Sequence, residues 1–139
     1  MAFDREIAAI TCFCEASSAT PAERRAIIWV MKNRLHDQKR RFGLTIADVC
    51  LARYQFSEWL DDKADSANLH RAARALDDDP IMLDCLAAFD AVMAAPSRDD
   101  PTGGSCHYTD KTIDPPAWAA PPAVLALETE HFRFYRGVS

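Results

Sequence analysis

The sequence predicts an α+β fold that is mostly α, with a small β portion near the C-terminus. Before residue 96, apolar residues recur at spacings of three and four, and helix-capping residues precede several of these stretches. After residue 105, aromatic and polar residues alternate instead. The chain has 139 residues, of which 49% are hydrophobic, enough for one buried core. We therefore expect a single domain over residues 1–139.

The first predicted helix begins just after Phe3 and runs for about twelve residues. Its apolar stripe, expected to face the core, consists of Phe3, Ile7, Ile10 and Cys14. Glu15 falls at the C-terminal end of this helix, on a different face that it shares with Ala8 and Thr11. These two small residues are expected to leave room beside Glu15.

The second predicted helix runs from Pro21 to about His36. Thr20 and Glu23 form a capping box around Pro21, which suits a first helical position. The apolar face is expected to consist of Ile27, Val30, Met31 and Leu35. The cations of this helix are expected to be mostly solvated: Arg24, Arg25, Lys32 and Arg34.

Further helices are expected where capping residues precede apolar positions. Thr45 caps a short helix that reaches Cys50, and Asp79-Pro80 starts a helix over 81–95. Another helix is expected near 66–76, after an aromatic segment, Tyr54–Trp59, that breaks the helical period. The remaining expected elements are a loop over 96–104, a strand over 106–109, an extended stretch over 115–118 and a last strand over 131–135.

The charge balance disfavours several classes of partner. Lys and Arg number 16 and Asp and Glu 21, a net charge of −5, so binding to nucleic acid is not expected. No apolar run approaches the ~18 residues of a membrane span, and the first residues do not resemble an export signal. We expect synthesis in the cytoplasm without a signal peptide, and no membrane insertion. The clearest basic cluster is Lys39-Arg40-Arg41, expected on the side of the molecule that carries Glu15.

Five cysteines cannot all pair within one chain, so buried free thiols are expected, Cys50 and Cys85 above all. Cys12 and Cys14 are too close for the usual zinc spacing, and we expect neither a metal nor another cofactor. Cys106 and His107 are adjacent, and neighbours in a strand point to opposite faces, which is wrong for a nucleophilic dyad.

The order of several short motifs, from about Ile7 to Tyr135, resembles the cell-wall hydrolases of the spore-cortex-lytic type. These motifs are Cys14-Glu15-Ala16, Val30-Met31-Lys32-Asn33-Arg34, Gln55-Phe56-Ser57, His107-Tyr108, Pro116-Ala117-Trp118 and His131-x-Phe-x-Phe134-Tyr135. The resemblance implies a catalytic domain of lysozyme-like fold that cleaves peptidoglycan glycan strands at the MurNAc–GlcNAc linkage, by lytic transglycosylation. The chain departs from the family pattern at Ser17-Ser18-Ala19, where Arg-Gly-Glu is usual, and at Thr109, where His is common.

The same resemblance implies the site residues. Glu15 matches the general acid, and partial burial at a helix C-terminus would favour its protonated form. Substrate-binding residues are expected to be Gln55, Ser57, His107, Tyr108 and Trp118. The candidates for a second carboxylate are Asp37, Glu58, Asp61 and Asp110. A lytic transglycosylase needs none of them, because the C6 hydroxyl of the substrate attacks the anomeric carbon.

Two biological settings and one other class of function stay open. The protein is expected to be a phage-type lysin or a wall-degrading component of a virion or transfer particle. The alternative is a catalytically idle glycan-binding or virion-structural domain on the same scaffold. The altered Ser17-Ser18-Ala19 segment suggests this alternative. A stem-peptide amidase or peptidase would need metal ligands or a Cys-His pair that the sequence does not offer.

Overall fold

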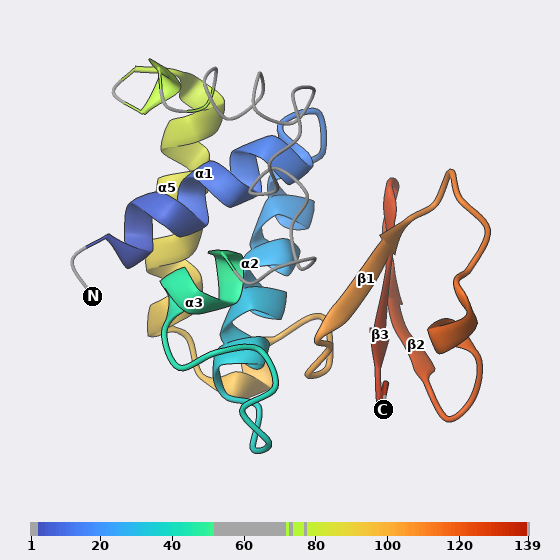
Figure 1. Ribbon diagram of the computed structural model, residues 1–139. Coiled ribbons are helices and arrows are strands. Elements are labelled where there is room, and N and C mark those ends of the chain that lie inside the picture. Colours follow the sequence, from blue (N-terminus) through green and yellow to red (C-terminus); the bar gives the residue numbers. More distant parts are fainter. Residues whose placement is uncertain (1–2, 52–71, 73, 77, 139) are drawn as a thin grey trace.

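The computed structural model describes residues 3–51, 72, 74–76 and 78–138. Its helices are α1 (Asp4–Ala16), α2 (Pro21–Leu35), α3 (Ile46–Leu51) and α5 (Pro80–Ala94), with short 3₁₀ turns η2 (Ser97–Asp99) and η3 (Ala117–Ala119). The strands are β1 (His107–Asp110), β2 (Val124–Glu128) and β3 (Phe132–Arg136). The helices form one layer, and the small sheet stands beside them (Figure 1). The predicted mostly α fold of the α+β class is confirmed.

Helix starts follow the predicted caps. Thr20 Oγ1 accepts a hydrogen bond from the Glu23 amide at 3.1 Å, and a Glu23 carboxylate oxygen accepts one from the Thr20 amide at 3.0 Å. Asp79 Oδ1 accepts from the amides of Ile81 and Met82, which starts α5. Thr45 caps α3 through the Asp48 amide at 3.0 Å.

The predicted core face of α1 is only partly correct, because Ile7, Ile10 and Cys14 pack against the core but Phe3 does not. Phe3 is 65% exposed, and Ile7, Ile10 and Cys14 are only partly buried. The buried face is made mainly of small residues: Ala8, Ala9, Thr11, Cys12, Phe13 and Ala16. Small side chains allow the backbones of packed helices to approach closely, and α1 packs against α2, α3 and α5. Ala8 and Thr11 are fully buried in the core, so they do not supply the room that the sequence predicted beside Glu15.

The cations of α2 also differ from the prediction, since Arg25 is exposed but Arg24, Lys32 and Arg34 are buried. Each buried cation donates to backbone carbonyls: Arg24 to those at the end of α1 and in the loop that follows it, and Lys32 and Arg34 to those of distant segments. Lys32 Nζ donates to the carbonyls of Val92, Met93 and Ala95, at the C-terminal end of α5. Periodicity predicts solvation for a charged residue, but it cannot show that a long side chain has carbonyl acceptors inside the fold.

The sheet is antiparallel with strand order β1-β3-β2. Strands β1 and β3 correspond to the two that the sequence predicted, whereas β2 was not foreseen. Residues 117–119, expected to be extended, form the 3₁₀ turn η3. Phe132 and Phe134 of β3 belong to the hydrophobic core and attach the sheet to the helices. Within the described part of the chain, no helix is long and apolar enough to cross a membrane.

Several expected features cannot be placed. The segment Tyr54–Trp59, with Gln55 and Ser57, lies outside the described residues, and so does most of the helix expected at 66–76. All five cysteines are free, as expected, and Cys12, Cys50 and Cys85 are buried.

Candidate functional site

Glu15 lies half-buried in the last turn of α1. Arg24 holds this end of the helix, because its guanidinium donates to the carbonyls of Ala16, at 3.4 Å, and Ala19, at 2.8 Å. The same guanidinium forms an ion pair with Asp84 of α5 at 2.8 Å. The positive charge of Arg24 offsets the partial negative charge of the helix end.

Arg34 connects Glu15 to the sheet. Its Nε donates to the Cys106 carbonyl at 2.7 Å, just before β1. Burial lowers the pKa of Arg34, and the charges of Tyr108, Cys106, Cys50 and Glu15 oppose that shift. A guanidinium stays protonated in proteins, so a buried cation stands among these groups. The charges of Glu15 from α1 and Tyr108 from β1 therefore both act on Arg34.

The sheet separates the expected substrate-binding residues. Tyr108 packs on the core side, with its ring centroid 5.7 Å from those of Phe132 and Phe134. Neighbouring residues of a strand point to opposite faces, so His107 lies on the other side. There its ring centroid is 5.1 Å from that of Trp118, which is 36% exposed. The structure brings Tyr108 into the neighbourhood of Arg34 and pairs His107 with Trp118, but it does not join the two groups.

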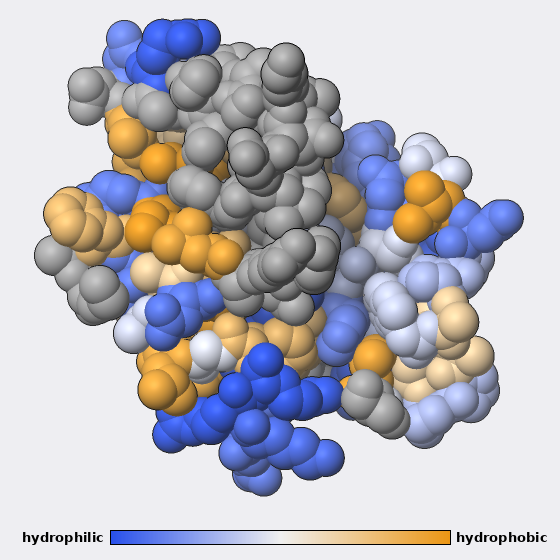
Figure 2. Space-filling model, in the orientation of Figure 1, coloured by the Kyte–Doolittle hydropathy of each residue, from blue (hydrophilic) through white to orange (hydrophobic). Residues whose placement is uncertain are grey.

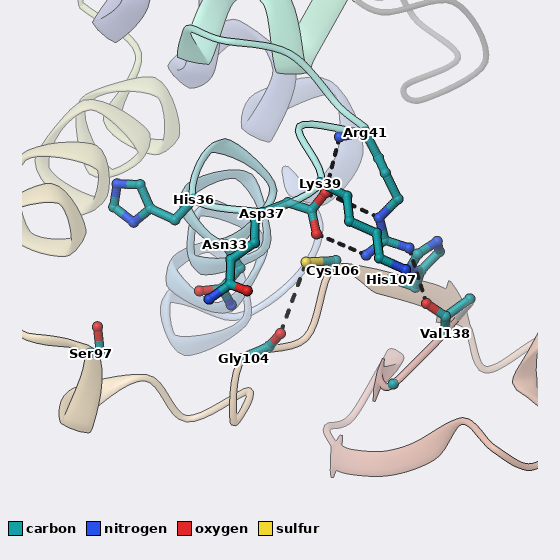
Figure 3. A pocket seen from close by; sticks show the side chains of 12 residues that line it. Asn33, His36, Asp37, Lys39, Arg41, Ser97, Gly104, Cys106, His107 and Val138 are labelled. Atoms are coloured by element: carbon teal, nitrogen blue, oxygen red, sulfur yellow. Dashed lines mark hydrogen bonds and ion pairs between the residues drawn. The ribbon is translucent and has the colours of Figure 1, made fainter.

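A cavity of about 530 Å³ opens at the end of α2 (Figure 3). Its lining consists of Asn33, His36, Asp37, Gln38, Lys39, Arg41, Ser97, Gly104, Cys106, His107, Gly137 and Val138. Burial and the charges of Arg34 and Arg41 lower the pKa of His107 to about 4, so this ring is neutral at pH 7. Burial raises the pKa of the Cys106 thiol. Both residues line the cavity, in contrast to the expected opposite orientation, but a protonated thiol is a poor nucleophile.

Only part of this cavity has a signal in the sequence. The run Lys39-Arg40-Arg41 was recognised as basic, and two of its members line the cavity. Figure 2 shows a strongly hydrophilic protrusion over the loop that follows α2. The contributions of His36 and residues 137–138 had no sequence signal, because they come from the end of a helix and the segment after the last strand.

Glu23 has a second role that sequence reasoning missed. Its carboxylate accepts hydrogen bonds from the Thr129 hydroxyl at 2.5 Å and the His131 amide at 2.8 Å, and it contacts His131 Nδ1 at 2.8 Å. Burial alone would raise the pKa of Glu23, but these bonds and the one from the Thr20 amide lower it to about 2. A buried carboxylate therefore joins the start of α2 to the β2–β3 turn.

Among the described residues, Glu23, Glu130 and His131 place possible metal-ligand atoms within 4.8 Å of one another. The Glu23 oxygens already accept from Thr20, Thr129 and His131. These bonds explain the cluster without an ion, and the expected absence of a metal stays a prediction.

A family model described as Cell Wall Hydrolase matches residues 20–135 of this chain, which comprise all of α2 and most of the cavity lining and the sheet. The chain therefore belongs to the cell wall hydrolase family, and its general function is the degradation of peptidoglycan. The matched range begins after Glu15, so the match does not bear on that residue. Comparisons with curated proteins and with solved structures give no significant match. The lysozyme-like character of the fold stays a prediction.

Proposed function

We propose that the protein cleaves glycan strands at the MurNAc–GlcNAc linkage as a lytic transglycosylase, with Glu15 as general acid and then base. The Glu15 carboxyl protonates the glycosidic oxygen, and the bond from this oxygen to the anomeric carbon breaks. The C6 hydroxyl of the same sugar attacks the anomeric carbon and gives its proton to the Glu15 carboxylate. The products are a 1,6-anhydro end and a new chain end with a free hydroxyl, and no water is consumed.

The observation that supports this proposal best is the half-buried Glu15 in the last turn of α1, in the neighbourhood of Arg34 and Tyr108. Arg24 fixes the helix end that carries Glu15 through two carbonyls. The Tyr108 hydroxyl can donate to a substrate oxygen, and the His107–Trp118 pair offers an aromatic surface for a sugar face. Contacts from Gln55 and Ser57 are part of the proposal, although both lie outside the described residues.

The candidate second carboxylates that the structure describes are already engaged. Asp37 pairs with Arg41 at 3.0 Å, and Asp110 accepts from the Thr112 amide at 2.8 Å. Glu58 and Asp61 lie outside the described residues. An inverting or retaining hydrolase needs a second carboxylate that is available to water or to the anomeric carbon. The engagement of Asp37 and Asp110 thus favours attack by the substrate's own hydroxyl.

The test is the mass of the fragments that the wild-type protein releases from purified cell wall. A lytic transglycosylase gives anhydro ends, which are lighter by one water than the reducing ends that a hydrolase gives. Anhydro ends are the expected result, and exclusively reducing ends would replace the proposed reaction by a muramidase reaction. Binding to wall without any release would favour the idle glycan-binding domain.

The proposed setting is a phage-type lysin or a wall-degrading component of a virion-like particle. Immunodetection distinguishes the two, because a particle component persists in purified particles, whereas a free lysin is found in the lysate alone.

A further inference from the structure

The cavity at the end of α2 has neither Glu15 nor Tyr108 in its lining. Arg34 links the cavity to Glu15: it donates to the carbonyl of Cys106, which lines the cavity, and Glu15 is among the charges that act on it. The adjacent Asn33 also lines the cavity, and its Nδ2 donates to Asp100 at 2.8 Å and to the Ser105 carbonyl at 3.0 Å. These bonds fix the Asn33 amide and leave its Oδ1 to accept from a ligand.

The cavity has an uneven charge balance. Arg41 binds both oxygens of Asp37, from Nε at 3.1 Å and from Nη2 at 3.0 Å, and its Nη1 donates to the Val138 carbonyl at 3.1 Å (Figure 3). Asp37 is thus neutralised inside the cavity. Lys39 has no carboxylate within ion-pair distance among the residues that the structure describes. One cation of the lining is therefore available to a ligand.

The pKa shifts of two groups in the cavity lining, Asp37 and His107, have the direction expected near cations. Hydrogen bonds from Arg41 and the charges of Arg41 and Lys39 lower the pKa of Asp37. The lowered pKa of His107, due to burial and then to Arg34 and Arg41, has the same sign. Burial is the largest cause of the His107 pKa shift and the hydrogen bond from Arg41 is the largest cause of the Asp37 pKa shift, with nearby cations adding to each. The charge of Lys39 is therefore the main attraction for an anion.

We propose that this cavity binds the stem peptide that peptidoglycan carries on its glycan strand. A carboxylate of the stem peptide forms an ion pair with Lys39. The proposal rests on the proposed function, because the stem peptide is attached to a sugar of the linkage at which Glu15 is proposed to act. About 530 Å³ lies within the usual range of ligand cavities, about 300–1,000 Å³, and is enough for part of a peptide. Neutral His107 and the Asn33 oxygen supply polar contacts for its amide groups.

The test compares two substrates from the same wall, purified free of teichoic acid: intact strands, and strands whose stem peptides an amidase has removed. The variant is Lys39→Glu, and the matched control is Arg25→Glu, an exposed cation at the other end of α2. Both changes lower the net charge by the same amount, so the long-range attraction to the wall is equally affected. The readout is kcat/KM on each substrate.

Lys39→Glu is expected to lower the ratio of activity on intact strands to activity on peptide-free strands by about three- to tenfold. The effect is modest because an exposed ion pair contributes little, but it is measurable because reversal of the charge at residue 39 replaces attraction by repulsion. Arg25→Glu is expected to leave this ratio unchanged. An unchanged ratio for Lys39→Glu, or an equal fall for Arg25→Glu, would overturn the proposal. Failure of the proposed function is a separate result, because the wild-type protein would then release fragments from neither substrate.

Discussion

Replacement of Glu23 by Gln is expected to destabilise the fold strongly. The Glu23 side chain is 2% exposed, and its pKa falls from 4.5 to about 2 through its bonds to Thr129, Thr20 and His131. At about 1.4 kcal/mol per tenfold change in equilibrium, this lowering corresponds to about 3 kcal/mol of stability at pH 7. For a domain of this size, that loss lowers Tm by roughly 10 °C.

The expected pH dependence follows from the direction of the shift. A carboxylate whose pKa is lower in the folded state stabilises the fold above its ordinary pKa, and this contribution is lost as the pH falls from about 5 toward 2. The contact with Glu23 raises the pKa of His131, so its contribution is lost as the pH rises through the folded value. The difference in stability between wild type and Glu23→Gln should therefore be about 3 kcal/mol at pH 6–7 and fall to less than half of that at about pH 3.

The assay is thermal unfolding followed by circular dichroism at both pH values. The control is Glu130→Gln, an exposed residue beside His131, for which a change below about 0.5 kcal/mol is expected. Equal Tm differences for Glu23→Gln at pH 7 and pH 3 would refute the reasoning, and so would a Tm within about 2 °C of wild type at pH 7. If Glu23→Gln does not fold, Thr129→Val removes the hydroxyl donor alone and should give a smaller loss with the same pH trend.

Two further predictions follow. Lys32→Met should lower the free energy of unfolding, measured with urea, by about 2–3 kcal/mol, because the carbonyls of Val92, Met93 and Ala95 lose a buried charged donor. A loss below about 0.5 kcal/mol would show that these bonds do not stabilise the end of α5. Treatment with a strong chelator should leave wall cleavage unchanged, because the proposed reaction uses only a carboxyl and a substrate hydroxyl; a loss that zinc restores would contradict this mechanism.

The sequence predicted local structure better than packing. The caps at Thr20, Thr45 and Asp79 were correctly identified because a cap depends on residues only a few positions apart. The most buried face of α1 was not predicted, because it consists mainly of Ala, Thr and Cys side chains that a search for large apolar residues ranks low. The close approach of neighbouring helices determines which face of α1 is buried. The residue pattern of one helix does not show how closely its neighbours approach.

The candidate site shows the same division. Glu15 was correctly placed at the end of α1, because that position depends only on local periodicity. The separation of Tyr108 from His107 follows from strand alternation and was predictable once β1 was assigned. The link from Glu23 to His131 and the cavity around Asp37 depend on segments about a hundred residues apart, which no local pattern connects.

The central claim is that Glu15 performs the cleavage, and its most direct test is the release of soluble fragments from purified cell wall by Glu15→Gln. The change is nearly isosteric, and Glu15 is only half-buried, so Tm should stay close to that of the wild-type protein. We expect release to fall by at least about a hundredfold, since a positioned general acid contributes about 10²–10⁴-fold, while binding to the wall persists. Cleavage at the wild-type rate by the folded variant would contradict the assignment of Glu15.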